Sequence, residues 1–216
     1  MKQSSSHTTA TPHYWQQACR ELSRGDDTLA ALIEQYPDVT LRSKGSAFQT
    51  LLRAIVGQQI SVKAAAAVWK RFEVALERKV TPHSLLEIDE ETLRESGLSR
   101  QKIRYMKDLA EHFQQGLLRP QTFRSLEDDA LLKKLTAVRG IGQWTAEMFL
   151  IFQLHRPDIF PVQDIGLLRA IELHYLPANA KIAGAEAHAF GERWRPWRTV
   201  ATWYLWRSLD PFPVEY

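Results

Sequence analysis

The chain has 216 residues, with 44% hydrophobic side chains and a formal net charge of +3. That apolar fraction suffices for a substantial core in one large or two small domains, which excludes a mainly disordered chain. No apolar run approaches the roughly 18 residues of a membrane span, and residues 1–12 are polar, so neither a membrane protein nor a secretory signal is indicated. The single cysteine, Cys19, excludes an intramolecular disulfide and a cysteine-ligated metal or iron–sulfur site.

The chain begins with a polar stretch at residues 1–11, which is rich in serine and threonine and is expected to be a flexible tail. Helical periodicity follows almost everywhere. Thr11, which a proline follows, predicts the N-cap of a first helix that ends at Gly25. Asp27 is expected to cap a second helix, which Pro37 terminates.

The later helices repeat apolar residues three and four positions apart. Ser46 and Ser61 are expected to cap amphipathic helices that extend to Val56 and Leu76. Further helices are predicted at about 82–86, 90–95, 100–115, 126–137, 143–153, 165–175, 185–194 and 196–208. Only Val39–Arg42 suggests an extended piece, since runs of alternating β-branched residues are otherwise absent. The predicted class is all-α, with about ten helices.

Seven tryptophans are many for this length, and four of them, Trp194, Trp197, Trp203 and Trp206, fall near the C-terminus. Core packing alone explains such a cluster, because buried aromatic rings contribute much of a core's stability. The alternative is a platform on which a planar ligand stacks. The composition leaves both interpretations open.

The most specific stretch of the sequence is LTAVRGIGQWTA at residues 135–146. It predicts the end of one helix, a tight turn and the start of another helix. Gly140 and Gly142 permit positive φ and let another backbone approach closely. The N–H groups that begin the new helix, with Arg139 beside them, suit a phosphate group. An ordinary corner between two helices is the alternative, because Gly-x-Gly alone is weak evidence.

Together with Ile141 and Thr145, these glycines resemble the helix-hairpin-helix motif of the base-excision DNA glycosylases. Downstream, FPVQDIG at residues 160–166 places Asp164 where that superfamily has an essential aspartate. Upstream, residues 52–61 resemble the segment that fills the gap left by the flipped base. Residues 97–102 and 194–198 are similar to further landmarks of the family. The branch that the chain resembles most is 3-methyladenine DNA glycosylase II, whose members remove alkylated bases.

The resemblance implies an all-α fold of two helical lobes, with the active site in the cleft between them. Residues 45–155 would form the central helical domain with the hairpin. Residues 12–44 would combine with residues 156–216 in the second lobe. Arg139 stands where the motif often has proline, which loosens the turn but adds a charge for a phosphate.

The resemblance also implies a mechanism in which the enzyme extrudes an alkylated base from double-stranded DNA. Gln59 matches the position of the side chain that fills the gap. Trp144, Met148 and Trp206 match pocket positions, and aromatic faces attract a cationic base such as 3-methyladenine or 7-methylguanine. For Trp144 a core position is the alternative.

Asp164 matches the carboxylate that stabilises the positive charge growing on the sugar. The residues alone favour a helix N-cap at this position, since Asp164 directly precedes a predicted helix. The two roles are compatible, because the capping hydrogen bond holds the carboxylate in a fixed position.

Three rival functions remain. A bifunctional glycosylase/lyase carries a lysine in the second helix of the hairpin, and here Trp144 occupies that position, so strand cleavage through a Schiff base is not expected. A noncatalytic helix-hairpin-helix DNA-binding module, or a helical adaptor, would leave Asp164 and the aromatic cluster without a catalytic use.

The seven histidines form no HExxH or clustered Cys/His pattern, so no catalytic metal or other cofactor is expected. A monovalent cation held by the hairpin is implied by the family alone. We expect a monomer with double-stranded DNA as its partner and no membrane contact. The implied location is the bacterial cytoplasm, at the nucleoid, or the nucleus in a eukaryote.

Overall fold

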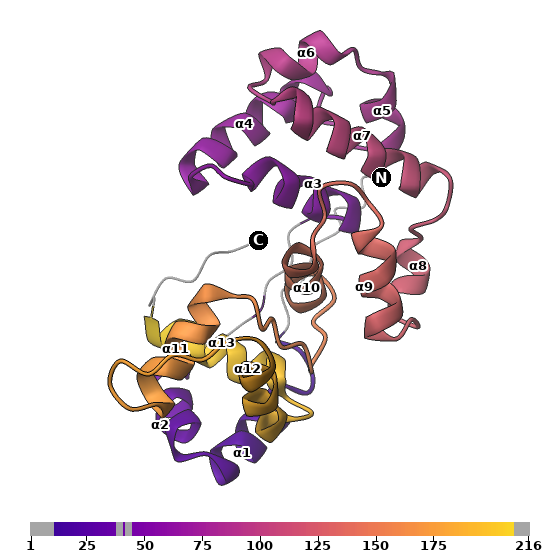
Figure 1. The fold of residues 1–216 in the computed structure, drawn as a ribbon. Coiled ribbons are helices and arrows are strands. Elements are labelled where there is room, and N and C mark those ends of the chain that lie inside the picture. Colours follow the sequence, from indigo (N-terminus) through magenta and orange to yellow (C-terminus); the bar gives the residue numbers. More distant parts are fainter. Residues whose placement is uncertain (1–10, 38–40, 42–44, 210–216) are drawn as a thin grey trace. The chain divides into compact units, whose positions relative to one another are not determined.

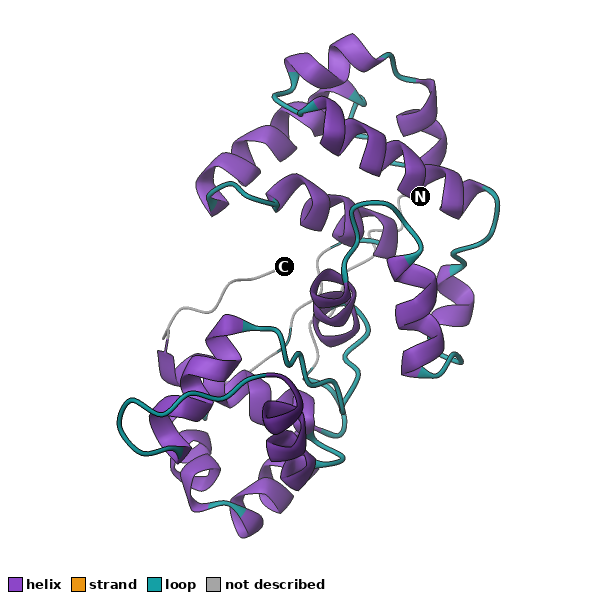
Figure 2. Cartoon of the chain, viewed as in Figure 1, coloured by secondary structure: helices purple, strands orange, loops and turns teal. Residues whose placement is uncertain are grey.

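A computed structural model describes residues 11–37, 41 and 45–209. Within these residues every regular element is a helix (Figures 1 and 2), so the all-α prediction is confirmed. Residues 1–10 of the expected tail, and Val39–Arg42 apart from Leu41, lie outside the described residues. No helix in the described ranges is long and apolar enough to cross a membrane.

The described part of the chain contains thirteen α-helices and one short 3-10 helix, η1. They are α1 (Trp15–Gly25), α2 (Asp27–Gln35), α3 (Ala47–Gly57), α4 (Val62–Ala75), α5 (Pro82–Glu87), α6 (Glu90–Glu95), α7 (Arg100–Gln114), α8 (Pro120–Phe123), α9 (Asp128–Thr136), α10 (Gln143–Phe152), α11 (Ile165–Tyr175), α12 (Gly184–Gly191), η1 (Glu192–Trp194) and α13 (Arg198–Leu209).

These helices divide into two compact units. The first unit takes both ends of the chain, residues 11–37, 41 and 150–209, and therefore holds α1, α2, α11, α12, η1 and α13. The second unit takes residues 45–149, with α3 to α9 and most of α10. Two stretches far apart in sequence thus share the first core.

Helix α7 is central to the second unit, where it packs against α3, α5 and α6. Its side chains Ile103, Met106, Leu109 and Ala110 are completely or almost completely buried. Their spacing of three and four residues is the pattern from which this helix was predicted. The polar side of α7 remains available to support the hairpin.

In the first unit, α13 packs against α1, α2 and α11. All residues from Arg198 to Leu205 are buried, polar side chains included. Trp194 and Trp203 lie in this core with 1% and 6% of their surface exposed, whereas Trp197 and Trp206 are partly exposed. The tryptophan cluster therefore serves core packing at two positions.

Of the N-caps predicted for the first four helices, two are wrong and two are confirmed. Helix α1 begins at Trp15 after Tyr14, not after Thr11, because residues 12–14 form a turn in which Trp15 N donates to the carbonyl of Pro12. Asp26, not Asp27, caps α2 by accepting from Leu29 N. Ser46 and Ser61 cap α3 and α4 as predicted. The short helix α8 was not predicted.

Candidate active site

Asp164 accepts hydrogen bonds from two different elements of the first unit. It is the N-cap of α11, where its Oδ1 accepts a hydrogen bond from Leu167 N at 2.7 Å, so the predicted capping role is confirmed. The indole N–H of Trp206, on α13, donates to the same oxygen at 2.8 Å. Two donors from different elements therefore fix the orientation of this carboxylate.

Trp206 fits beside Asp164 because Gly166 has no side chain. A Cβ at Gly166 would lie 3.1 Å from Asp164 Oδ1 and 3.4 Å from the indole Cδ1 of Trp206. The ring of Trp206 also stacks on Phe152, with centroids 5.9 Å apart and planes 10° from parallel. The structure thus joins Asp164 and Trp206, two of the predicted site residues, and adds Phe152, which the sequence did not single out.

Trp144 and Met148 lie one turn apart on α10, in the second unit. Trp144 is 37% exposed at the start of the helix, and Met148 is only 4% exposed. An exposed tryptophan at a helix start is not a core residue, so the core alternative for Trp144 is wrong. Part of its ring therefore faces solvent.

The hairpin turn at Val138–Gly142 leads into α10. Gly140 has φ +82°, as its glycine suggested, and a Cβ at this position would overlap the ring of Tyr105 on α7. The carbonyl of Gly140 accepts from Gln58 Nε2 at 2.7 Å. Only glycine therefore fits here, and neither Tyr105 nor Gln58 gave a sequence signal for this contact.

Gly142 differs from Gly140. Its φ is not positive, so the conformational freedom of glycine is not used here, and nothing lies within 4 Å of a Cβ built on it. Ala146 N donates to the carbonyl of Gly142, which makes Gly142 the residue before the first turn of α10. The N–H groups of a helix's first turn have no partner within the helix, and a Cβ on Gly142, just before that turn, would meet no other atom within 4 Å.

Ile141 and Thr145 support the turn from inside, since they are only 3% and 8% exposed. Arg139 is different, because 75% of its side chain is exposed. Its backbone N donates to Asp108 Oδ2 at 2.9 Å, and its Nε lies 3.4 Å from Asp108 Oδ1. The Asp108 carboxylate is only 13% exposed, whereas the exposed guanidinium can also bind a phosphate from the solvent side.

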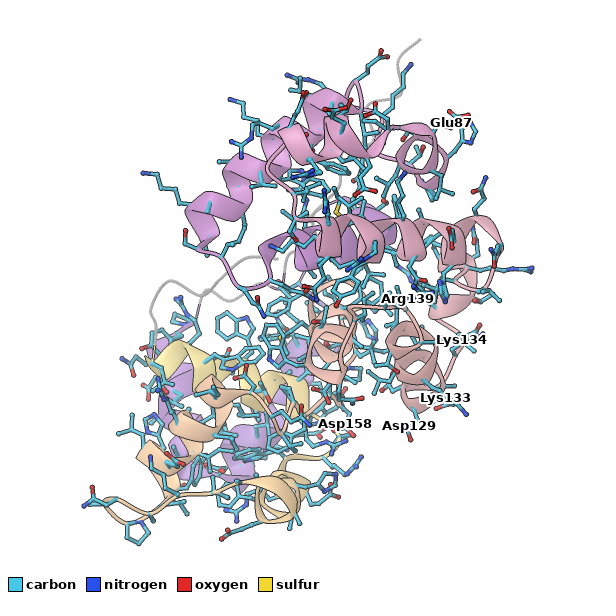
Figure 3. The ribbon with its side chains drawn as sticks, turned by 45° about the horizontal axis from the view of Figure 1, so that its top comes forward. Glu87, Asp129, Lys133, Lys134, Arg139 and Asp158 are labelled. Carbon is cyan, nitrogen blue, oxygen red and sulfur yellow. The ribbon has the colours of Figure 1, made fainter. Side chains whose placement is uncertain are left out.

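Positive charge continues along the helix before the hairpin. Lys133 and Lys134 are exposed in the last turn of α9, and Figure 3 labels them together with Arg139. No sequence pattern singled out these lysines. Their position next to the turn would add attraction for a polyanion.

Gln59 lies in the exposed turn between α3 and α4. Its φ of +59° is in the left-handed region, which costs a residue with a side chain about 1–2 kcal/mol. The next residue, Ile60, is 39% exposed. Such strain at an exposed turn is typical of functional positions. Lys102, whose Nζ donates to the carbonyl of Val56 at 2.7 Å, supports the turn from α7, and burial lowers the pKa of Lys102.

The family of this chain follows from these features and from its relatives. The sequence pattern of the HhH-GPD superfamily base excision DNA repair proteins matches residues 52–196. This chain belongs to the HhH-GPD superfamily. The match includes Gln59, the hairpin, Trp144 and Asp164, and ends before Trp206. The resemblance predicted from the hairpin is therefore confirmed.

Individual HhH-GPD relatives agree with this assignment. The chain is 34% identical over 184 residues to DNA-3-methyladenine glycosylase 1 of Schizosaccharomyces pombe, covering 83% of this chain and 80% of the relative. The crystal structure of a DNA-3-methyladenine glycosidase from Bacillus halodurans is similar at a TM-score of 0.81 and 36% identity, over 94% of this chain and 91% of that one. An S. pombe 3-methyladenine DNA glycosylase in complex with abasic DNA gives a TM-score of 0.73 at 30% identity, covering 92% of this chain and 100% of that one.

The described residues hold no group of three or more His, Cys, Asp or Glu side chains arranged to bind a metal ion. The ionisable group best placed for chemistry at the predicted site is instead Asp164, with an indole donor on its Oδ1. Such an arrangement suits electrostatic stabilisation of a cation by a fixed carboxylate.

Proposed function

We propose that this protein is a monofunctional DNA glycosylase that excises alkylated bases, such as 3-methyladenine and 7-methylguanine, from double-stranded DNA. The observation that carries the proposal is Asp164, an oriented carboxylate in an HhH-GPD chain whose relatives are DNA-3-methyladenine glycosylases. A carboxylate held rigidly before the substrate arrives needs little reorganisation as charge develops.

In this mechanism the hairpin and the Gln59 turn hold the DNA while the base is outside the stack. The N–H groups at the start of α10, with Arg139, bind a phosphate without reading sequence. Gln59, whose backbone is left-handed and which is exposed in its turn, fills the gap in the stack. Flipping then brings the glycosidic bond within reach of the enzyme.

The chemistry uses the positive charge of the damaged base. Trp144 and Trp206 offer aromatic faces to this cationic ring, and Met148 adds a polarisable thioether. The base leaves with the electron pair of the glycosidic bond, and Asp164 stabilises the oxocarbenium-like sugar and orients the attacking water. Because Trp144 replaces the lysine that a lyase needs, the product is an abasic site in an intact strand.

We also propose an oligomeric state, a location and a partner for the protein. The protein acts as a monomer on DNA, at the bacterial nucleoid or in a nucleus, and has no membrane partner. It needs no catalytic metal or cofactor; a monovalent cation at the hairpin would serve DNA binding, not chemistry.

The test is release of free bases from methylated duplex DNA, separated by chromatography. We expect 3-methyladenine and 7-methylguanine to appear with wild-type protein and not with Asp164→Asn. Borohydride trapping serves as the control for lyase chemistry, and a covalent enzyme–DNA adduct would contradict the monofunctional mechanism. Absence of any released base would contradict the glycosylase itself.

A further inference from the structure

The first turn of α13 is hydrogen-bonded to the segment that joins α10 to α11, residues 153–164. Thr199 is completely buried. Its Oγ1 donates to the carbonyl of Arg156 at 2.6 Å and accepts from Ile159 N at 2.9 Å. Its own N donates to the carbonyl of Pro157 at 3.0 Å. A single residue thus bonds three backbone positions of this segment.

Arg198, next to Thr199, forms an ion pair with the same segment. Its side chain is 10% exposed and forms a fork on Asp158, with Nε 2.7 Å from Oδ1 and an Nη 3.0 Å from Oδ2. The same Nη donates to the backbone carbonyl of Asp158 at 3.0 Å. Figure 3 labels Asp158. A planar guanidinium holding two carboxylate oxygens and a carbonyl fixes direction as well as distance.

Packing and a turn also fix the residues between Ile159 and Asp164. The ring of Phe160 is buried against Gly191, where a Cβ would lie 2.5 Å from the ring, and it packs edge-on to Trp194 with centroids 5.8 Å apart. Asp164 N then donates to the carbonyl of Pro161 at 2.9 Å, which closes a turn.

Helix α13 also holds the other end of the segment. Trp206 follows Thr199 by about two helical turns, so both residues lie on one face of α13. Trp206 donates to Asp164 Oδ1 and stacks on Phe152, which precedes the segment. The start and the end of the segment are therefore attached to the same face of one buried helix.

We propose that Thr199 and Arg198 are positioning residues for base excision, which set the location of Asp164 by fixing residues 156–159 on α13. The inference rests on the proposed role of Asp164 as the catalytic carboxylate. Neither residue touches the substrate. They act because misplacing a catalytic group by about 1 Å can cost as much as 10²-fold in rate.

Thr199→Val is the decisive variant, since it keeps the shape of the side chain and removes the hydroxyl that bridges Arg156 and Ile159. Thr202→Val is the matched control. Thr202 lies one turn later on α13, is also completely buried, and its Oγ1 has no hydrogen-bond partner among the described residues. Thr199→Ser restores the hydroxyl, and Arg198→Lys keeps the charge but loses the fork.

We expect Thr199→Val to lower the single-turnover excision rate of 7-methylguanine by ~10-fold or more, with Kd for abasic-site DNA unchanged. Thr199→Ser and Thr202→Val should excise at the wild-type rate, and Arg198→Lys should be slow like Thr199→Val. Thermal unfolding of each variant gives the folded fraction by which rates are normalised. Excision by Thr199→Val at the wild-type rate, or equal losses in Thr199→Val and Thr202→Val, would overturn the inference.

Amide hydrogen exchange separates this inference from the proposed function. Leu167 N–H, which is bonded to Asp164 Oδ1, reports on the carboxylate without any chemistry. We expect Leu167 to exchange faster in Thr199→Val and unchanged in Thr202→Val. Unchanged exchange at Leu167 in Thr199→Val would overturn the positioning role even if the bases are excised, whereas a wild-type protein that releases no base contradicts only the proposed function.

Discussion

At the scale of single residues, Asp164 combines two tasks that one substitution can separate. Asparagine keeps an Oδ1 that can accept from both Leu167 N and the indole of Trp206, and it caps helices about as well as aspartate. We therefore expect Asp164→Asn to change the free energy of unfolding by less than ~1 kcal/mol. Loss of the negative charge should lower excision by on the order of 10² or more.

Single-turnover excision and thermal unfolding measure these two effects. The affinity of Asp164→Asn for DNA should hold or rise, because a negative charge has left a surface that faces phosphates. Normal excision by this variant would leave N-capping as the whole role of Asp164.

Trp206 donates a hydrogen bond through its indole N–H and stacks through its ring face. Substitution by phenylalanine removes the N–H and keeps an aromatic face. In Trp206→Phe the ring can still stack on Phe152, while Asp164 Oδ1 loses the indole donor at 2.8 Å. We expect excision to fall by roughly 10-fold, with abasic-DNA affinity unchanged, because the carboxylate loses an orienting bond. Single-turnover kinetics of Trp206→Phe measure this effect. Full activity would mean that Trp206 acts through ring stacking alone and not through its hydrogen bond.

At the scale of elements, the hairpin offers two glycines with different constraints. Alanine at Gly140 would overlap Tyr105 at positive φ, so Gly140→Ala should lose about 1–3 kcal/mol of stability. Alanine at Gly142 meets nothing within 4 Å, so stability should be maintained. If a phosphate approaches the start of α10, the added methyl group weakens binding to all DNA sequences alike.

Equilibrium unfolding and DNA titration of the two variants provide the measurement. Gly142→Ala is the informative one, because its fold is expected to be intact. Wild-type affinity in Gly142→Ala would contradict phosphate binding at the hairpin.

The cap of α2 shows why element boundaries were harder to predict than the elements. The sequence pattern led to Asp27, but its neighbour Asp26 is the cap, and Tyr175 and Trp194 both donate to the Asp26 carboxylate at 2.9 Å. These partners are more than a hundred positions away, so no local pattern contains them. Burial and Asp26 together raise the pKa of Tyr175, which keeps its hydroxyl a donor.

This difference predicts unequal effects of two neighbouring substitutions. Asp26→Ala leaves Leu29 N, the Tyr175 hydroxyl and the Trp194 indole without their acceptor, so it should cost about 2–4 kcal/mol. Asp27→Ala removes only an exposed charge in the first turn of α2 and should cost under ~1 kcal/mol. Urea unfolding of both variants tests this, and equal costs would show that the shared carboxylate is not what holds α2.

At the scale of the whole molecule, the sequence predicted what depends on short-range pattern. Apolar spacing located nearly all helices, and the hairpin with its downstream aspartate indicated the family. The supports of the site were not predictable, because Tyr105 beneath Gly140, Gln58 on the Gly140 carbonyl and Thr199 beneath residues 156–159 depend on packing between distant segments. Nothing distinguishes such a threonine or tyrosine from any other before the chain is folded.

Acid sensitivity of the whole fold follows from groups whose pKa values are lowered. Burial lowers the pKa of His174 from 6.5, and hydrogen bonds from Lys181 and Arg195 lower the pKa values of Glu172 and Glu192 from 4.5. In each case the unfolded chain takes up the proton at a higher pH than the folded chain does. The stabilisation from these three groups is therefore complete above about pH 6.5 and falls on acidification, first as His174 is protonated in the unfolded chain and again below about pH 4.5, as the glutamates are protonated there.

A glutamine at position 174 isolates the first step, because its amide nitrogen can reach Ser208 Oγ as His174 Nε2 does but does not titrate. We expect the free energy of unfolding of wild-type protein to decline between about pH 7 and pH 5.5, and that of His174→Gln to stay nearly level there. Both should lose stability near pH 4.5. Denaturant unfolding at half-unit pH intervals gives the two curves, and parallel curves above pH 5.5 would show that the first decline does not come from His174.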